Sequence, residues 1–93
     1  MTPVTLDASL QIPDEVIFRE LDGEAVVLNL DTGIYFGLDA VGTRIWRLLE
    51  EHKSLRPVLD TMAAEYEATP DRLLRDLLAF AERLNGKGLI TLE

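Results

Sequence analysis

The tripeptide Asp31-Thr32-Gly33 has the most direct link to catalysis, because aspartic proteases carry the same three residues at their active site. Those enzymes pair two such aspartates, which share a proton, in an all-β fold. Here the tripeptide follows an apolar run, where Asp and Gly are expected turn residues, and the chain after Leu38 has a helical pattern. We therefore interpret the tripeptide as a turn.

Other catalytic and ligand-binding combinations are sparse. The chain has no cysteine, which excludes disulfides, thiolate metal sites and thiol catalysis. Its single histidine, His52, lies in a charged segment typical of the C-terminal end of a helix. The glycines do not have the spacing of a phosphate-binding loop. We expect no enzymatic activity, no cofactor and no metal site.

The length of 93 residues allows one small domain, and the 47% hydrophobic and 28% charged composition is that of a chain that folds. The N-terminus lacks the basic and apolar segments of a signal peptide. No run approaches the roughly 18 apolar residues that a membrane span needs. We therefore expect a cytoplasmic protein that does not bind membranes.

The net charge of −8 is unevenly distributed along the chain. Residues 1–43 contain one base and eight acids, whereas residues 44–93 are nearly balanced. An acidic front half repels phosphate, so we expect no nucleic-acid partner. If a peptide that binds near this half is basic, its association should slow with added salt.

Residues 1–14 show neither helical nor strand periodicity, and we expect an extended N-terminal arm before a domain at 15–93. Within the domain, the pattern predicts strands at 16–21, 25–30 and 34–38. Asp22-Gly23 is a typical hairpin turn between the first two strands. Together these segments predict a three-stranded antiparallel meander.

The period changes from 2 to 3.6 after Leu38 and predicts three helices. Asp39, Ser54 and Thr69 are the expected N-caps, and the third helix should end at Gly86 or Gly88. Residues 89–92 then form a short strand or tail. The fold class is therefore α+β and similar to a winged helix-turn-helix, with a three-stranded antiparallel sheet followed by three helices.

The strand at 34–38 is a candidate edge strand, and it has no Lys or Pro to discourage pairing. An extended peptide could add to this edge beside the third helix, whose apolar arc of about 160° is wider than one-sided packing needs. A wide core face also explains that arc, and the arm or the 89–92 tail could instead cover the edge. The candidate peptide-binding residues are Ile34, Tyr35, Phe36 and Gly37 on the strand, and Leu74, Arg75, Leu78 and Ala79 on the helix.

A DNA-binding winged-helix regulator is the alternative, because the third helix carries Arg72, Arg75 and Arg83. Acidic residues interrupt these arginines, which favours a solvated face over a phosphate-binding one.

The chain also resembles a known family. The resemblance lies in the run from Leu21 to Asp39, in Gly42 and Ile45-Trp46-Arg47-Leu48-Leu49, and in later segments up to Gly88-Leu89-Ile90. These residues are similar to the PqqD-like family of leader-peptide-binding domains, also called RiPP recognition elements. The Leu-Asn-x-x-Thr-Gly-x-Tyr form is most similar to the stand-alone proteins of lasso-peptide biosynthesis.

This resemblance implies a non-catalytic adaptor that binds the leader of a ribosomally made precursor as an added strand. The groove would lie between the third strand and the third helix, at the eight candidate residues above. The implied partners are the precursor leader and a separate leader peptidase that receives the bound precursor.

Overall fold

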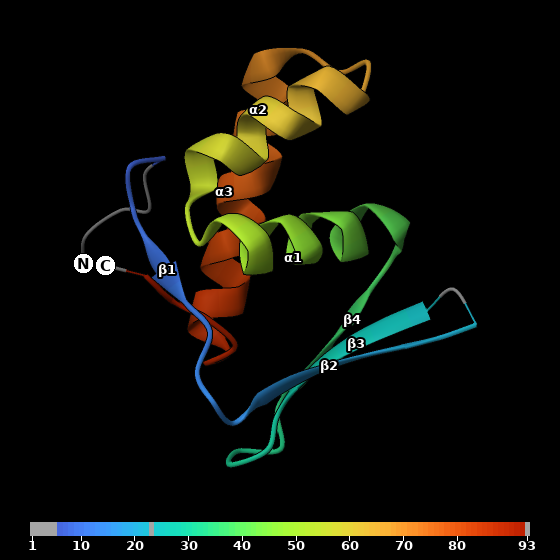
Figure 1. Cartoon of the computed structure of the whole chain (residues 1–93), viewed down its shortest axis with the longest axis vertical. Helices are drawn as coiled ribbons and strands as arrows, with labels where there is room; N and C mark the ends of the chain where they lie inside the picture. Colours follow the sequence, from blue (N-terminus) through green and yellow to red (C-terminus); the bar gives the residue numbers. More distant parts are fainter. Residues whose placement is uncertain (1–5, 23, 93) are drawn as a thin grey trace.

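The computed structural model describes residues 6–22 and 24–92, which form two small sheets and three helices. Strands come first, three helices follow, and a short strand comes last (Figure 1). The elements are β1 (Leu10–Gln11), β2 (Val16–Leu21), β3 (Glu24–Asn29), β4 (Tyr35–Leu38), α1 (Ala40–His52), α2 (Leu55–Glu65), α3 (Pro70–Gly86) and β5 (Thr91–Leu92). The expected α+β class is confirmed, including the three-stranded sheet before the helices.

Strands β2, β3 and β4 form an antiparallel meander with β3 at its centre. Val27 lies opposite Phe18 on one side and Phe36 on the other, so these three side chains project from the same face. The helices lie over that face (Figure 1), where Val27 is fully buried. The opposite face carries Leu28 and Tyr35, and Tyr35 is exposed.

The turn predicted at Asp31-Thr32-Gly33 is confirmed, and Asn29 organises it. The side-chain oxygen of Asn29 accepts hydrogen bonds from the N–H groups of Asp31 and Thr32, at 2.9 and 3.1 Å. Gly33 has a φ of +76°, a conformation that glycine adopts without strain. The Asn29 amide also donates to the carbonyl of Gly88, 59 residues away in sequence. Of the other predicted turn, Asp22 has a φ of +54°, whereas Gly23 lies outside the described residues.

Two of the three expected helix caps are formed. The Asp39 carboxylate accepts a hydrogen bond from the N–H of Gly42 at 2.7 Å, and the Thr69 hydroxyl accepts one from Arg72 at 3.3 Å. Ser54 precedes α2 but its side chain makes no capping hydrogen bond, which corrects that prediction. The backbone of Ser54 is extended and pairs with Ser9 instead.

The N-terminal segment and the C-terminal tail pair with each other. Leu10 of β1 lies opposite Leu92 of β5 in an antiparallel pair. Leu10 is buried, and its N–H donates to the carbonyl of Lys53 at 3.0 Å. Both segments lie on the far side of the helices from β4 (Figure 1), so neither covers the β4 edge within the described residues.

The core lies between the sheet and the helices. Trp46 of α1 is almost fully buried and stacks on Phe18 of β2, with ring centroids 6.4 Å apart. Leu49 and Leu84 bring α1 and α3 into the same apolar cluster. Each fully buried side chain of this size contributes about 1.5–3 kcal/mol. This packing fixes α1 and α3 in place beside β4.

Candidate functional site

The first component of the site is the open edge of β4. In the strand order β2-β3-β4, no described strand pairs with the outer side of β4. The N–H of Asn29 donates to the carbonyl of Ile34 at 2.9 Å, which sets the hydrogen-bonding register between β3 and β4. Since antiparallel pairs alternate, Phe36 and Leu38 bond to β3, whereas the N–H and C=O groups of Tyr35 and Gly37 face the open edge.

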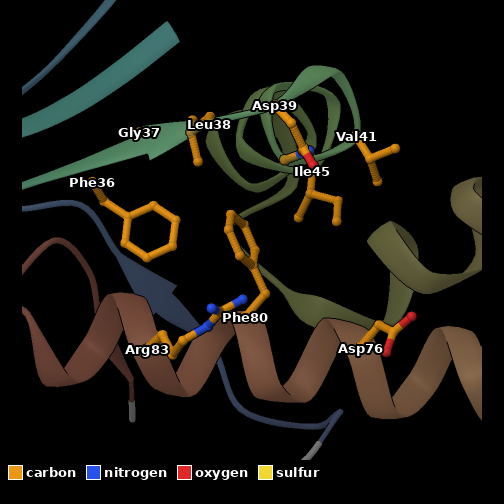
Figure 2. Close-up of a pocket in the computed structure, with 10 residues that line it drawn as sticks. Phe36, Gly37, Leu38, Asp39, Val41, Ile45, Asp76, Phe80 and Arg83 are labelled. Carbon is orange, nitrogen blue, oxygen red and sulfur yellow. The ribbon is translucent and has the colours of Figure 1, made fainter.

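The second component is a pocket of about 440 Å³ beside this edge. Ligand clefts commonly have volumes of about 300–1,000 Å³. Three elements enclose the pocket, with the end of β4 on one side, the start of α1 above and one face of α3 below (Figure 2). Its lining residues are Phe36, Gly37, Leu38, Asp39, Val41, Gly42, Ile45, Asp76, Phe80 and Arg83.

The interior of the pocket is apolar. The rings of Phe36 and Phe80 meet edge to face, with centroids 5.9 Å apart and an interplanar angle of 72°. Ile45 is buried behind them, whereas Val41 remains 43% exposed at the rim. Aromatic and branched side chains in this arrangement can accept an apolar side chain from a bound peptide.

Charged residues lie at both ends of the pocket. At the Phe36 end, the guanidinium carbon of Arg83 lies 5.5 Å from the Phe36 ring centroid, and the ammonium nitrogen of Lys87 lies 5.9 Å from it. At the opposite end lie Asp39 and Asp76 (Figure 2). The pocket is therefore basic at the start of β4 and acidic at its end.

The predicted strand residues lie together at this site. Phe36 and Gly37 line the pocket, and Tyr35 contributes edge-facing backbone groups. Ile34 directly precedes β4 and is 41% exposed. The structure thus brings the strand part of the predicted set to one continuous edge.

The predicted helix residues lie on other faces of α3. Asp76, Phe80 and Arg83 span an arc of about 60° at 100° per residue, and this arc faces the pocket. Relative to Phe80, the other predicted residues point away by about 100° to 160°; they are Leu74, Arg75, Leu78 and Ala79. Leu78 packs against the core cluster instead. The contribution of these four residues to binding stays a prediction.

The sequence signal that could have identified the pocket face is the i, i+4, i+7 spacing of Asp76, Phe80 and Arg83, in which an aromatic residue is flanked by opposite charges. Phe80 belongs to the apolar arc of the third helix, but the arc alone does not show which side meets the strand.

The shifted pKa values of the described groups belong to residues outside the pocket lining. A hydrogen bond from Arg44 of α1 lowers the pKa of the Glu65 carboxyl on α2. The same hydrogen bond raises the pKa of Arg44. A hydrogen bond to Asp7 likewise raises the pKa of Arg56. These ion pairs join elements of the fold.

Other chemistry expected from the sequence is placed as follows. His52 is the last residue of α1, is exposed and does not line the pocket. Within residues 6–22 and 24–92, no group of three or more His, Asp or Glu side chains could hold a metal ion. No helix in this part of the chain is long and apolar enough to cross a bilayer.

Comparison with protein families identifies the class. Residues 24–90 match the family described as Coenzyme PQQ synthesis protein D (PqqD), a span that includes β3, β4 and all three helices. The chain therefore belongs to the PqqD family, and the resemblance seen in its sequence is confirmed.

Two solved structures are similar over most of their length. One is TbiB1 in complex with the TbiA(beta) leader peptide, with 46% identity, a TM-score of 0.81, and coverage of 87% of this chain and 94% of that chain. The other is a lasso peptide synthetase B1 complexed with the leader peptide, with 26% identity, a TM-score of 0.73, and coverage of 88% and 96%. No curated protein sequence matches this chain.

Proposed function

We propose that this protein binds the leader peptide of a ribosomally made precursor, in lasso-peptide biosynthesis, by adding the leader as a strand to the β4 edge. The observation that carries the proposal is the open edge of β4 beside an apolar pocket, in a chain that is similar to two solved complexes with leader peptides. Main-chain pairing supplies affinity and register in this mode of recognition, and pockets for alternate side chains supply specificity.

The edge-facing groups of Tyr35 and Gly37 define how a peptide would pair. Each offers one N–H and one C=O, so a peptide of a few residues can form up to four hydrogen bonds. Successive side chains of an added strand point to opposite faces. Every second leader side chain would therefore enter the pocket lined by Phe36 and Phe80, while the others lie over the outer face of the sheet.

The protein acts in this proposal as an adaptor that is not an enzyme. The pocket lining consists of apolar side chains, glycines, two aspartates and one arginine, and this set holds no nucleophile with an adjacent base. Cleavage would be carried out by a separate leader peptidase, which receives the precursor while its leader is held on β4.

The test is direct binding of the leader encoded by the precursor gene next to the gene for this chain. We expect saturable binding by fluorescence anisotropy, with one leader bound per chain. Absence of binding at tens of micromolar would contradict the proposal. A salt-sensitive gel shift on upstream DNA would instead favour the winged-helix regulator. Two of the arginines that such a regulator would use on DNA have contacts within the protein, since Arg83 lies over Phe36 and Arg72 lies near Asp76.

A further inference from the structure

The basic end of the pocket is formed by Arg83, near the end of α3, and by Lys87, the residue that directly follows this helix. Both cations lie over the ring of Phe36, at 5.5 and 5.9 Å from its centroid. These distances are within the range of about 6 Å in which a cation is attracted to an aromatic face. The ring therefore attracts both positive charges to the same end of the pocket.

Neither cation has an acidic partner among the described residues. The ion pairs found there involve four other arginines, namely Arg44, Arg47, Arg56 and Arg72. Other described bases, such as Arg19 and Arg75, also have no ion pair there, so Arg83 and Lys87 are distinguished by their position beside the pocket. Their positions leave two donor groups available to a carboxylate that arrives with a ligand.

The acidic end of the pocket differs, because its carboxylates already have internal contacts. Asp39 accepts the capping hydrogen bond from Gly42 at 2.7 Å. Asp76 has Arg72 at 3.9 Å, one turn earlier on the same helix. Asp39 is thus engaged as a helix cap, whereas Asp76 remains 71% exposed, so the pocket offers cations at one end and an available carboxylate at the other.

From this geometry we propose that Arg83 and Lys87 select leaders with an acidic residue beside their docked apolar segment. This inference rests on the proposed function and specifies the peptide chemistry that the site prefers. An antiparallel strand on β4 would run from the Asp39 end toward the Phe36 end (Figure 2), so the acid belongs on the C-terminal side.

The spacing of the acid follows from the helix. The backbone of Arg83 lies about 4.5 Å beyond that of Phe80 along the axis of α3, and the backbone of Lys87, just after the helix, lies about 10.5 Å beyond it. An extended peptide advances about 3.3 Å per residue. Because both charged groups lie near the Phe36 ring, the preferred Asp or Glu lies within roughly three residues after the leader residue whose side chain contacts Phe80.

The experiment is a double-mutant cycle between the protein and the same neighbouring-gene leader. We expect Arg83→Gln and Lys87→Gln each to weaken binding about threefold, and the double variant about tenfold, with a weaker dependence on salt. Changing the leader acid to its amide should weaken binding to the wild-type protein by a similar factor and have little further effect on the double variant. Arg19→Gln is the matched control, because it removes one exposed charge from β2, which β3 separates from the β4 edge, and Arg19 does not line the pocket.

The outcomes separate this inference from the proposed function. A leader that binds the wild-type protein but shows no coupling to either residue would overturn the charge selection alone, and so would a bound leader with no acid in the stated window. Coupling only to an acid on the N-terminal side would contradict the antiparallel orientation. A leader that does not bind the wild-type protein at all would contradict the proposed function itself.

Discussion

Gly37 allows a sharp test of strand addition, because one substitution there removes an edge-facing N–H and another keeps it. A Cβ built at Gly37 meets no atom within 4 Å, and the φ of this residue lies outside the left-handed region. Gly37→Ala should therefore leave the fold and the edge hydrogen bonds intact. Gly37→Pro removes the donor on the side that does not bond to β3, where an edge strand tolerates proline.

The magnitude follows from what the proline removes. One net hydrogen bond is worth about 1 kcal/mol. In the proline variant, the leader carbonyl that loses its donor would also face the pyrrolidine ring without a hydrogen-bond partner. We expect Gly37→Pro to weaken leader binding at least tenfold, or about 1.4 kcal/mol, and Gly37→Ala to change it less than threefold. Fluorescence anisotropy with a labelled leader measures the affinity of both variants, and urea denaturation checks that each variant is folded.

Equal affinities of folded Gly37→Pro and Gly37→Ala variants would refute the strand-addition argument. If the proline variant does not fold, N-methylation of single leader amides tests the same hydrogen bonds from the peptide side. Methylation at alternate leader positions should then weaken binding, and uniform tolerance would contradict strand pairing.

Three further predictions concern the fold and the pocket. Asn29→Ala should lower the free energy of unfolding in urea by about 2–3 kcal/mol, because the buried amide makes three hydrogen bonds to the backbone; a loss below 0.5 kcal/mol, on the order of a surface substitution, would argue against this role. Val41→Ala should weaken leader binding about threefold without changing the melting temperature, whereas Leu74→Ala should weaken it less, since Leu74 is not in the pocket lining; the reverse order would favour the helix face expected from the sequence. The hydrogen bond from Arg44 lowers the pKa of Glu65 in the folded protein. The stabilisation from this ion pair is therefore present above the unfolded-state pKa of Glu65 and is lost as the pH falls through its folded-state pKa. Glu65→Gln should reduce the acid sensitivity of the free energy of unfolding in urea, and an unchanged pH profile would contradict this.

Local residue chemistry was sufficient to predict most elements of the fold. The turn at Asp31-Thr32-Gly33 and the caps at Asp39 and Thr69 depend on neighbours within three residues, and each occurs as expected. Ser54 makes no side-chain cap, and its backbone forms a bridge with Ser9, 45 positions earlier. A contact of that separation leaves no signal in the local sequence pattern.

The same distinction between local and distant contacts explains which parts of the candidate site could be predicted from the sequence. The β4 residues could be predicted because an edge strand exposes its own backbone groups. The pocket face of α3 could not, because periodicity defines an apolar arc but not which side of it packs on Phe36; that depends on the position of Phe80 in the core. The charge of the front half alone was equally insufficient to predict the charge around the pocket, because Arg83 and Lys87 come from the other half of the chain.

The measurement that tests the central claim most directly is amide hydrogen exchange at individual β4 residues, with and without the leader. In the free protein, the amides of Phe36 and Leu38 bond to β3, whereas those of Tyr35 and Gly37 face the open edge. Strand addition predicts that leader binding slows exchange at Tyr35 and Gly37 far more than at the other two positions. Leader binding that leaves the exchange of both edge-facing amides unchanged would contradict the account.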